Sequence, residues 1–222
     1  MIIDTVIGAY NEAIFDTDKK AAFEAVNTGL ALGLSAEEIV FQVVIPSTEW
    51  WMAAITKDPD ANLAQHFMTA QIAGEVTERM LALFVKPPKI IGKVVIGTAH
   101  GDLHSLGKRI VMGCLKSMMV EAVDLGVNVP PERFVEEAIR HDALVIAISA
   151  MMVHTATGEK GCRGVRAILR EKGLEDRFRI VVGGAPFRFD EGLYRTVGAD
   201  DWSADGLAGS RLITELILKG MT

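Results

Sequence analysis

The change of rhythm near residue 90 is the feature that most constrains how this chain folds. Before it, apolar residues recur at every third or fourth position, which is the spacing of amphipathic helices. After it, short β-branched runs alternate with helical patterns, which is typical of a parallel sheet covered by helices. The Lys-Pro-Pro-Lys segment at 86–89 cannot continue a helix and favours an extended connector. The sequence therefore predicts two domains, 1–88 and 89–222.

The first domain is expected to be a small bundle of four or five antiparallel helices. Helical patterns cover 2–16, 18–32, 35–55 and 63–84. In the third pattern, Ser35 and Glu38 form a capping box at the start, and Pro46 is expected to bend or restart the helix. A turn-rich segment over 57–62 separates the third pattern from the fourth.

The second domain is expected to contain a parallel sheet of five strands. Strands are expected at 93–97, 122–125, 143–149, 178–183 and 200–203. Helices are expected at 106–119, 131–141, 160–172, 187–197 and 205–219. Open α/β sheets bind their ligands at the carboxyl ends of the strands. The loops that follow the strands are therefore the first place to look for a site.

Composition excludes several classes of protein. The net charge of -6, with a pI of about 5.4, argues against nucleic acid as a main partner. Cys114 and Cys162 are far apart and form no CxxC pair, so neither a disulfide framework nor a cysteine zinc site is expected. No apolar run reaches the roughly 20 residues of a membrane span, and the N-terminus lacks the basic region of a secretory signal. We expect a soluble, cytoplasmic protein that does not bind membranes.

The loop at 97–108, Gly-Thr-Ala-His-Gly-Asp-Leu-His-Ser-Leu-Gly-Lys, follows the first expected strand. It matches neither GxxxxGK[ST] nor GxGxxG, so a nucleotide site is not favoured. A single loop histidine is more often a surface residue than a metal ligand, but Asp102 lies two residues before His104. A carboxylate beside an imidazole fixes its tautomer and raises its basicity, as it does for metal-bound histidines. An Asp–His pair is also half of a hydrolytic triad, yet no serine lies in a GxSxG elbow.

Two later loops are expected at the same edge of the sheet. The third strand ends in Ser149-Ala150-Met151-Met152, and the fourth ends in Gly183-Gly184-Ala185-Pro186. Paired glycines at the end of a strand permit close approach of a ligand to the backbone, although they also suit a tight turn. Three loops at one edge favour a single extended ligand.

These motifs together resemble a known signature. Asp102-x-His104-x-x-Gly107, Ser149-x-Met151 and Gly183-Gly184 resemble the cobalamin-binding pattern DxHxxG…SxL…GG. The stretches 101–108, 123–135 and 182–186 further resemble the corrinoid proteins of anaerobic methyltransferase systems, which demethylate methylamines, methanol and methoxyaromatic compounds. The resemblance is strong over 90–219. It implies a helical cap bundle followed by a Rossmann-like, flavodoxin-like α/β domain that binds cobalamin.

The resemblance also implies a role for each matching residue. His104 would be the lower axial ligand of cobalt in the base-off, His-on mode, and Asp102 would hydrogen-bond the far nitrogen of its ring. Ser149 and the Gly183-Gly184 turn would line the slot for the displaced nucleotide tail. The other cofactor-binding positions of the motif are Ser105, Gly107 and Met151.

The sequence departs from the family pattern at a few places. Met151 replaces the usual leucine, which is a volume-conserving change. Ser105 stands where the family often has aspartate. Val153 and His154 stand where hydroxyl residues are usual, so the polar contacts around the nucleotide tail are expected to differ.

Two residues of the helical domain are candidates for the upper face of the cobalt. In cobalamin-dependent light sensors, a Trp and a Glu-His pair on comparable helices hold that position, which points to Trp51 and His66 here. Gln65 replaces the glutamate, however, and the spacing from Trp51 is longer. The alternative, that the tryptophans fill the core and His66 is a partly exposed polar residue, is favoured.

The resemblance implies a methyl carrier rather than a complete enzyme. The cofactor would be cobalamin, as methylcobalamin and cob(I)alamin, and other corrinoids are compatible with the same motif. The partners would be a substrate-specific methyltransferase, an acceptor methyltransferase that serves tetrahydrofolate or a thiol, and a reductive activase. A cobalamin-dependent sensor without turnover is the alternative.

Overall fold

The computed structural model describes residues 2–57, 63–85 and 89–220. Most of the turn predicted at 57–62, and the prolines of the predicted connector, lie outside the described residues. Contacts divide the chain into two compact units. The helical unit extends to Lys89 and also includes Lys116–Met119, and the α/β unit comprises Ile90–Leu115 and Val120–Thr222. Among the described residues, every helix is too short or too polar to cross a bilayer.

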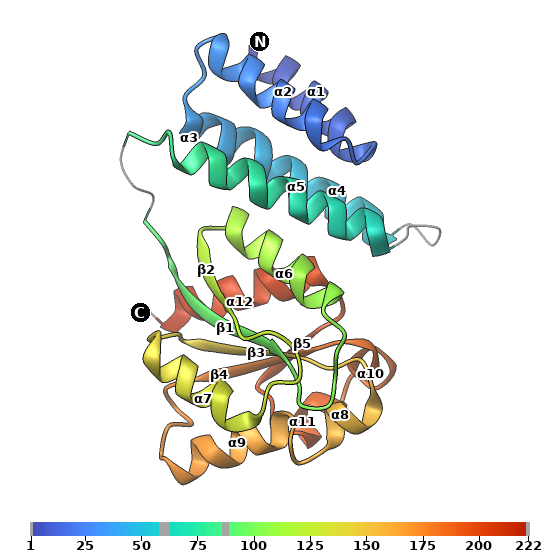
Figure 1. Cartoon of the computed structure of the whole chain (residues 1–222), viewed down its shortest axis with the longest axis vertical. Coiled ribbons are helices and arrows are strands. Elements are labelled where there is room, and N and C mark those ends of the chain that lie inside the picture. Colours follow the sequence, from blue (N-terminus) through green and yellow to red (C-terminus); the bar gives the residue numbers. More distant parts are fainter. Residues whose placement is uncertain (1, 58–62, 86–88, 221–222) are drawn as a thin grey trace. The chain divides into compact units, whose positions relative to one another are not determined.

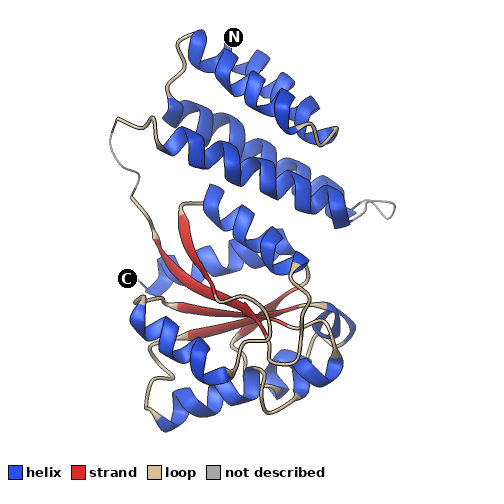
Figure 2. Cartoon of the chain, viewed as in Figure 1, coloured by secondary structure: helices blue, strands red, loops and turns tan. Residues whose placement is uncertain are grey.

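The helical unit consists of helices and turns in the part that is described (Figures 1 and 2). Its elements are α1 (Ile2–Phe15), α2 (Lys19–Ala31), α3 (Ala36–Glu38), the π-helix η1 (Ile39–Val44), α4 (Ile45–Lys57) and α5 (Leu63–Leu81). The largest fully buried side chains belong to Tyr10, Ile14, Ile39, Ile72 and Met80. These residues recur at helical spacing, so the predicted bundle is confirmed.

The start of the third predicted helix is formed as expected. The N–H of Glu38 donates to the hydroxyl oxygen of Ser35 (3.1 Å), and the N–H of Ser35 donates to the Glu38 carboxylate (2.8 Å). The interruption near Pro46 takes the form of the π-helix η1, which is followed directly by α4. Proline has no N–H to donate within a helix, and Pro46 lies directly after η1, so the helical run is irregular where that hydrogen bond is missing.

The α/β unit contains one parallel sheet. Its strands are β1 (Gly92–Thr98), β2 (Val120–Asp124), β3 (Val145–Ser149), β4 (Arg179–Gly183) and β5 (Asp201–Ser203). The strand order is β2-β1-β3-β4-β5, and every neighbouring pair is parallel. This order is flavodoxin-like, with a topological switch point between β1 and β3.

Helices cover both faces of the sheet (Figure 1). They are α6 (Leu106–Ser117), α7 (Pro131–Arg140), α8 (Val153–Thr157), α9 (Cys162–Glu171), α10 (Ala185–Phe189), α11 (Leu193–Thr196) and α12 (Gly206–Gly220). On one face, Phe134 of α7 and Val165 of α9 pack with Val95 of β1. On the other face, Leu115 of α6 and Ile213 of α12 pack in a separate core. Both faces of the strands are therefore apolar, as is usual for parallel sheets.

Some predicted elements differ from the structure. The helix predicted at 187–197 is wrong, because the chain forms α10 and α11 with a turn between them. In that turn the N–H of Gly192 donates to the Asp190 carboxylate (2.9 Å), which favours a turn over a continuous helix. The short helix α8 was not predicted. The helix predicted at 106–119 ends at Ser117, and Met119 then adopts a left-handed φ of 59° before β2 begins.

Candidate functional site at the carboxyl edge of the sheet

The three loops predicted to converge do lie at one edge of the sheet. Thr98 at the end of β1 is in register with Ser149 at the end of β3, and Ser149 is in register with Gly183 at the end of β4. The loops that follow therefore leave the sheet side by side. Asp102 and His104 follow β1, so they lie next to the switch point between β1 and β3, where sheets of this topology bind ligands.

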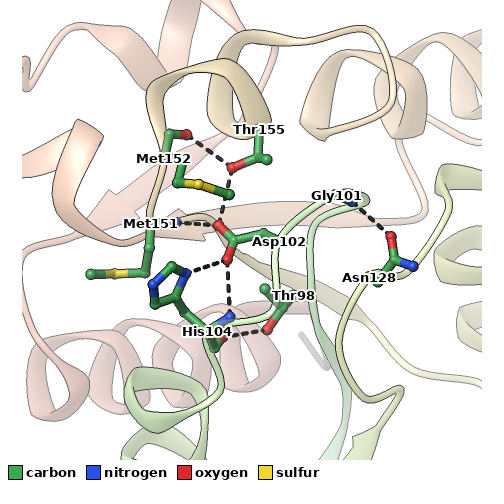
Figure 3. A network of polar contacts seen from close by, with 8 residues as sticks. All are labelled: Thr98, Gly101, Asp102, His104, Asn128, Met151, Met152 and Thr155. Carbon is green, nitrogen blue, oxygen red and sulfur yellow. Dashed lines mark hydrogen bonds and ion pairs between the residues drawn. The ribbon is translucent and has the colours of Figure 1, made fainter.

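Asp102 and His104 form a close pair (Figure 3). Oδ1 of Asp102 lies 2.7 Å from Nδ1 of His104 and also accepts the backbone N–H of His104 (3.0 Å). The Asp102 side chain has no exposed surface, whereas the His104 side chain is 58% exposed. The structure thus combines a buried carboxylate with an outward-facing imidazole.

The second oxygen of Asp102 is held by the loop that follows β3. Oδ2 accepts the backbone N–H of Met151 (2.7 Å) and faces the hydroxyl of Thr155 (3.0 Å). The Thr155 hydroxyl also lies 2.9 Å from the carbonyl oxygen of Met152, so its one proton is shared between two acceptors. The carboxylate of Asp102 therefore ties the loop after β1 to the loop after β3 (Figure 3).

These contacts fix the charge of Asp102 and the tautomer of His104. Burial alone would raise the pKa of Asp102. The hydrogen bonds donated by His104, Met151 and Thr155 outweigh that effect and lower the pKa to about 2. An ionised carboxylate can only accept, so Nδ1 of His104 is the donor. In the neutral ring Nε2 then keeps its lone pair, and this nitrogen points away from Asp102 (Figure 3).

Sequence reasoning missed Thr155. In the family pattern the usual hydroxyl residues stand at the positions of Val153 and His154, and both of these residues are exposed here. Thr155 is buried in α8, the short helix that periodicity did not predict. The only sign in the sequence was that Thr155, directly after these two positions, carries a hydroxyl group.

The glycines of the predicted site have two different explanations. Gly184 has a φ of +122°, and a Cβ there would lie 1.9 Å from the carbonyl oxygen of Ala150. Packing between the two loops alone therefore requires glycine at 184. Gly107 is exposed in the first turn of α6, and apart from its chain neighbours and its own helix a Cβ there would meet no atom within 4 Å. The fold therefore offers no packing reason for glycine at this position. Open space at Gly107 suits a ligand that lies close to the backbone.

Apolar side chains are exposed on the loops after β1 and β3 and at the start of α8. Leu103 is 71% exposed, Val153 66% and Met151 39%. Figure 3 shows the Met151 side chain beside the ring of His104. Exposed large apolar residues that gather at a binding edge favour a ligand with an extensive apolar surface.

The donor set fits one kind of metal group. Within the described residues, no three His, Cys, Asp or Glu side chains are grouped so that they could hold a bare metal ion. One exposed imidazole with its second nitrogen fixed by a carboxylate is instead suited to be an axial ligand, because a macrocycle supplies the other ligands of its metal. The residues present therefore fit a metal held in a macrocycle, a class of cofactor that includes cobalamin.

Trp51 and His66 lie in the helical unit. Trp51 is half-buried and packs against Phe15 and Trp50, with ring centroids 4.9 and 4.8 Å away. This packing accounts for Trp51 as part of the bundle. His66 lies in α5 and is half-buried. Contact of Trp51 or His66 with a cofactor stays a prediction.

Comparison with known proteins now adds to the geometry. Residues 92–208 match the family of the B12 binding domain. The dimethylamine corrinoid protein 2 of Methanosarcina mazei is 30% identical over 223 residues, which cover 97% of this chain and 94% of the relative. This chain belongs to the family of corrinoid proteins that carry a B12 binding domain. The family resemblance predicted from the sequence is therefore confirmed.

Solved structures confirm the fold of this corrinoid protein. A cobalamin-binding protein from Desulfitobacterium hafniense DCB-2 superposes with a TM-score of 0.73 at 22% identity, covering 95% of this chain and 98% of that one. The methanol:cobalamin methyltransferase complex of Methanosarcina barkeri gives a TM-score of 0.77 at 20% identity, over 97% of this chain and 80% of that one. The predicted fold class, a helical cap bundle with a Rossmann-like five-stranded domain, is confirmed.

Proposed function

We propose that this corrinoid protein binds cobalamin at the carboxyl edge of the sheet, base-off, with Nε2 of His104 as the lower axial ligand of cobalt. The observation that carries the proposal is the contact between the buried Asp102 carboxylate and Nδ1 of His104. The contact orients the ring and, in the neutral imidazole, places the proton on Nδ1, so that the lone pair of Nε2 faces outward.

The other residues of the edge serve the same ligand. The open space at Gly107 and the exposed apolar side chains of Leu103 and Met151 suit the broad face of the macrocycle. Ser149 and Gly183, in register at the ends of β3 and β4, would line the slot for the nucleotide tail, and Ser105 would lie beside it. Gly184 would support the slot by allowing the chain after β4 to pass close to Ala150.

We further propose that the protein carries a methyl group between a substrate-specific methyltransferase and an acceptor methyltransferase, with a reductive activase as a third partner. Cobalamin, when bound, supplies a cobalt centre that accepts and releases the methyl group. This chain would supply the axial nitrogen and the binding site. Relatives named as dimethylamine corrinoid proteins, matched over almost the whole chain, support this role. We place the exchange in the cytoplasm, together with both methyltransferases.

Binding is tested by titrating the full chain with cobalamin and recording the absorption spectrum. We expect about one equivalent to bind in the base-off form. His104→Ala should alter the spectrum of the bound cofactor. His141→Ala removes the histidine that caps the end of α7, before β3 at the opposite edge of the sheet, and is the matched control that should leave the spectrum unchanged. Identical spectra for the His104→Ala and wild-type proteins would contradict the axial assignment.

The carrier role is tested separately. The reduced protein should accept a methyl group from a substrate-specific methyltransferase and deliver it to an acceptor methyltransferase. Two measurements distinguish a carrier from a sensor. The first identifies the upper ligand that copurifies with the protein, and the second compares the size of the protein in light and in darkness. Copurified adenosylcobalamin together with light-dependent assembly would contradict the carrier.

A further inference from the structure

Asn128 lies in the loop 125–130 between β2 and α7, and it adopts an uncommon backbone conformation. Its φ is 53°, in the left-handed region that asparagine tolerates better than most residues. The residue is exposed and plays no part in the predicted cobalamin motif. Its contacts nevertheless reach the loop that carries His104.

Asn128 holds two consecutive residues of that loop. Its side-chain Oδ1 accepts the N–H of Gly101 (2.8 Å), and its own N–H donates to the carbonyl oxygen of Asp102 (3.0 Å). Gly101 is also left-handed, with a φ of 83°. Asn128 thus holds the backbone of Gly101 and Asp102 through two hydrogen bonds, which we call the clamp. Figure 3 shows the bond made by its side chain.

The loop that carries Asn128 is itself anchored. The N–H of Thr98 donates to the carbonyl oxygen of Gly126 (3.0 Å), and the N–H of Val129 donates to the carbonyl oxygen of Thr98 (2.9 Å). Asp124, which precedes this loop, accepts the N–H of Gly126 (2.8 Å) and pairs with the buried ammonium group of Lys108. Asn128 therefore connects the His104 loop to a fixed part of the sheet.

We propose that Asn128 is a positioning residue for the Asp102–His104 pair. The clamp sets the backbone of Asp102, the backbone sets where the carboxylate lies, and the carboxylate sets the tautomer and direction of the imidazole. The consequence for cobalt rests on the proposed function. The clamp itself acts within the protein and can be tested without a cofactor.

The test uses nuclear magnetic resonance on the full chain without cofactor. The readouts are the exchange rate of the Gly101 amide and the fraction of His104 with its proton on Nδ1. In Asn128→Gly, which removes the side chain without straining the backbone, we expect Gly101 to exchange about fivefold faster, as for the loss of one exposed hydrogen bond. The Nδ1–H fraction should fall. Asn128→Asp retains an acceptor oxygen and should restore both values.

A matched control separates the loss of the two Asn128 hydrogen bonds from the strain of placing alanine in a left-handed backbone conformation. Asp142 has a φ of 52° and lies before β3, at the opposite edge of the sheet. Asp142→Ala should leave both readouts unchanged, while Asn128→Ala should change them as Asn128→Gly does. An unchanged tautomer in Asn128→Gly would overturn the proposal, even where Gly101 exchanges faster.

Failure of the clamp and failure of the proposed function are distinguishable. If His104→Ala left the cobalt coordination unchanged, the axial assignment would fall, and the clamp would still be judged on the tautomer alone. With cobalamin loaded, Asn128→Gly should weaken the nitrogen signature of the axial ligand, and Asn128→Asp should restore it. A full-strength signature in Asn128→Gly would contradict the positioning role.

Discussion

The carboxyl edge of the sheet and the core of the helical unit differ in how their buried polar groups are paired. In the α/β unit, the buried carboxylate of Asp102 receives four hydrogen bonds from three residues. In the helical unit, the buried ring nitrogen of Trp51 and the buried side-chain oxygen of Asn11 have no hydrogen-bond partner within the described residues. Each hydrogen-bond partner of a buried carboxylate contributes to its stability, so the residue types at the edge of the sheet are more restricted than those in the bundle.

The difference matches the way each unit is built. Spacing alone places residues such as Ile14 and Ile72 in the core of the bundle, and apolar residues of similar volume are interchangeable there at modest cost. At the sheet edge, Asp102 meets partners 2, 49 and 53 positions away in the sequence. Such a network tolerates few substitutions, because each one leaves a buried charge or donor unpaired.

The largest expected effect tests whether the two cores are separate. Phe134→Ala removes a fully buried ring from the α/β core and should lower the free energy of unfolding of that unit by about 3–5 kcal/mol. The helical unit should keep its stability, as followed by hydrogen exchange in increasing urea. Ile72→Ala is the mirror-image variant in the bundle and should give the opposite pattern. Equal loss of protection in both units would show that they share one core.

The next effect sharpens the contrast between paired and unpaired polar groups. Asp102→Asn removes the charge and turns one acceptor into a donor that faces Met151 or His104. Without cofactor, it should lower the free energy of unfolding by about 2–3 kcal/mol at pH 7. Urea unfolding measures the loss. Glu136→Ala, at an exposed carboxylate in the middle of α7, should change stability by no more than about 0.5 kcal/mol.

The same variant gives a pH dependence with a defined sign. Because the pKa of Asp102 is lowered from 3.8 to about 2, the unfolded state takes up the proton first as the pH falls. The stabilisation is fully present above about pH 5 and is lost as the pH falls towards 2. The stability difference between wild type and Asp102→Asn should shrink by about 2 kcal/mol over that range. A difference that stays constant with pH would contradict the assigned charge.

The sequence predicts those features of the structure that depend on residues close together in the chain. Periodicity gives the helices and the strands, and the spacing of Asp102 and His104 gives the pair, because these patterns are local. The parallel sheet then brings Ser149 and Gly183 to the same edge. The contacts of Thr155 and Asn128 are not predictable in this way, since they depend on how separate loops pack. The turn at Asp190, which interrupts a helical pattern, likewise depends on a side-chain contact with the backbone.

The smallest effect concerns Thr155. Thr155→Val keeps the shape of the side chain and removes the hydroxyl, so Asp102 loses one of its four hydrogen bonds. We expect a loss of about 1 kcal/mol in the free energy of unfolding and a rise in the pKa of Asp102. Thr155→Ser retains the hydroxyl and is the control. A Thr155→Val protein with unchanged stability and an unchanged Asp102 pKa would show that this contact contributes nothing to the network.

The central claim is that a ring nitrogen of His104 is the axial ligand of cobalt. The direct measurement is the electron paramagnetic resonance spectrum of the cobalt(II) form of the full chain, prepared with ordinary histidine and with histidine labelled with nitrogen-15. Nitrogen-14 splits each cobalt line into a triplet, and nitrogen-15 splits it into a doublet. We predict that labelling converts triplets to doublets in the wild type and in His141→Ala, and that His104→Ala shows no histidine-derived splitting. Triplets that persist in the labelled wild type would mean that the nitrogen belongs to the cofactor's own base, and would contradict the account.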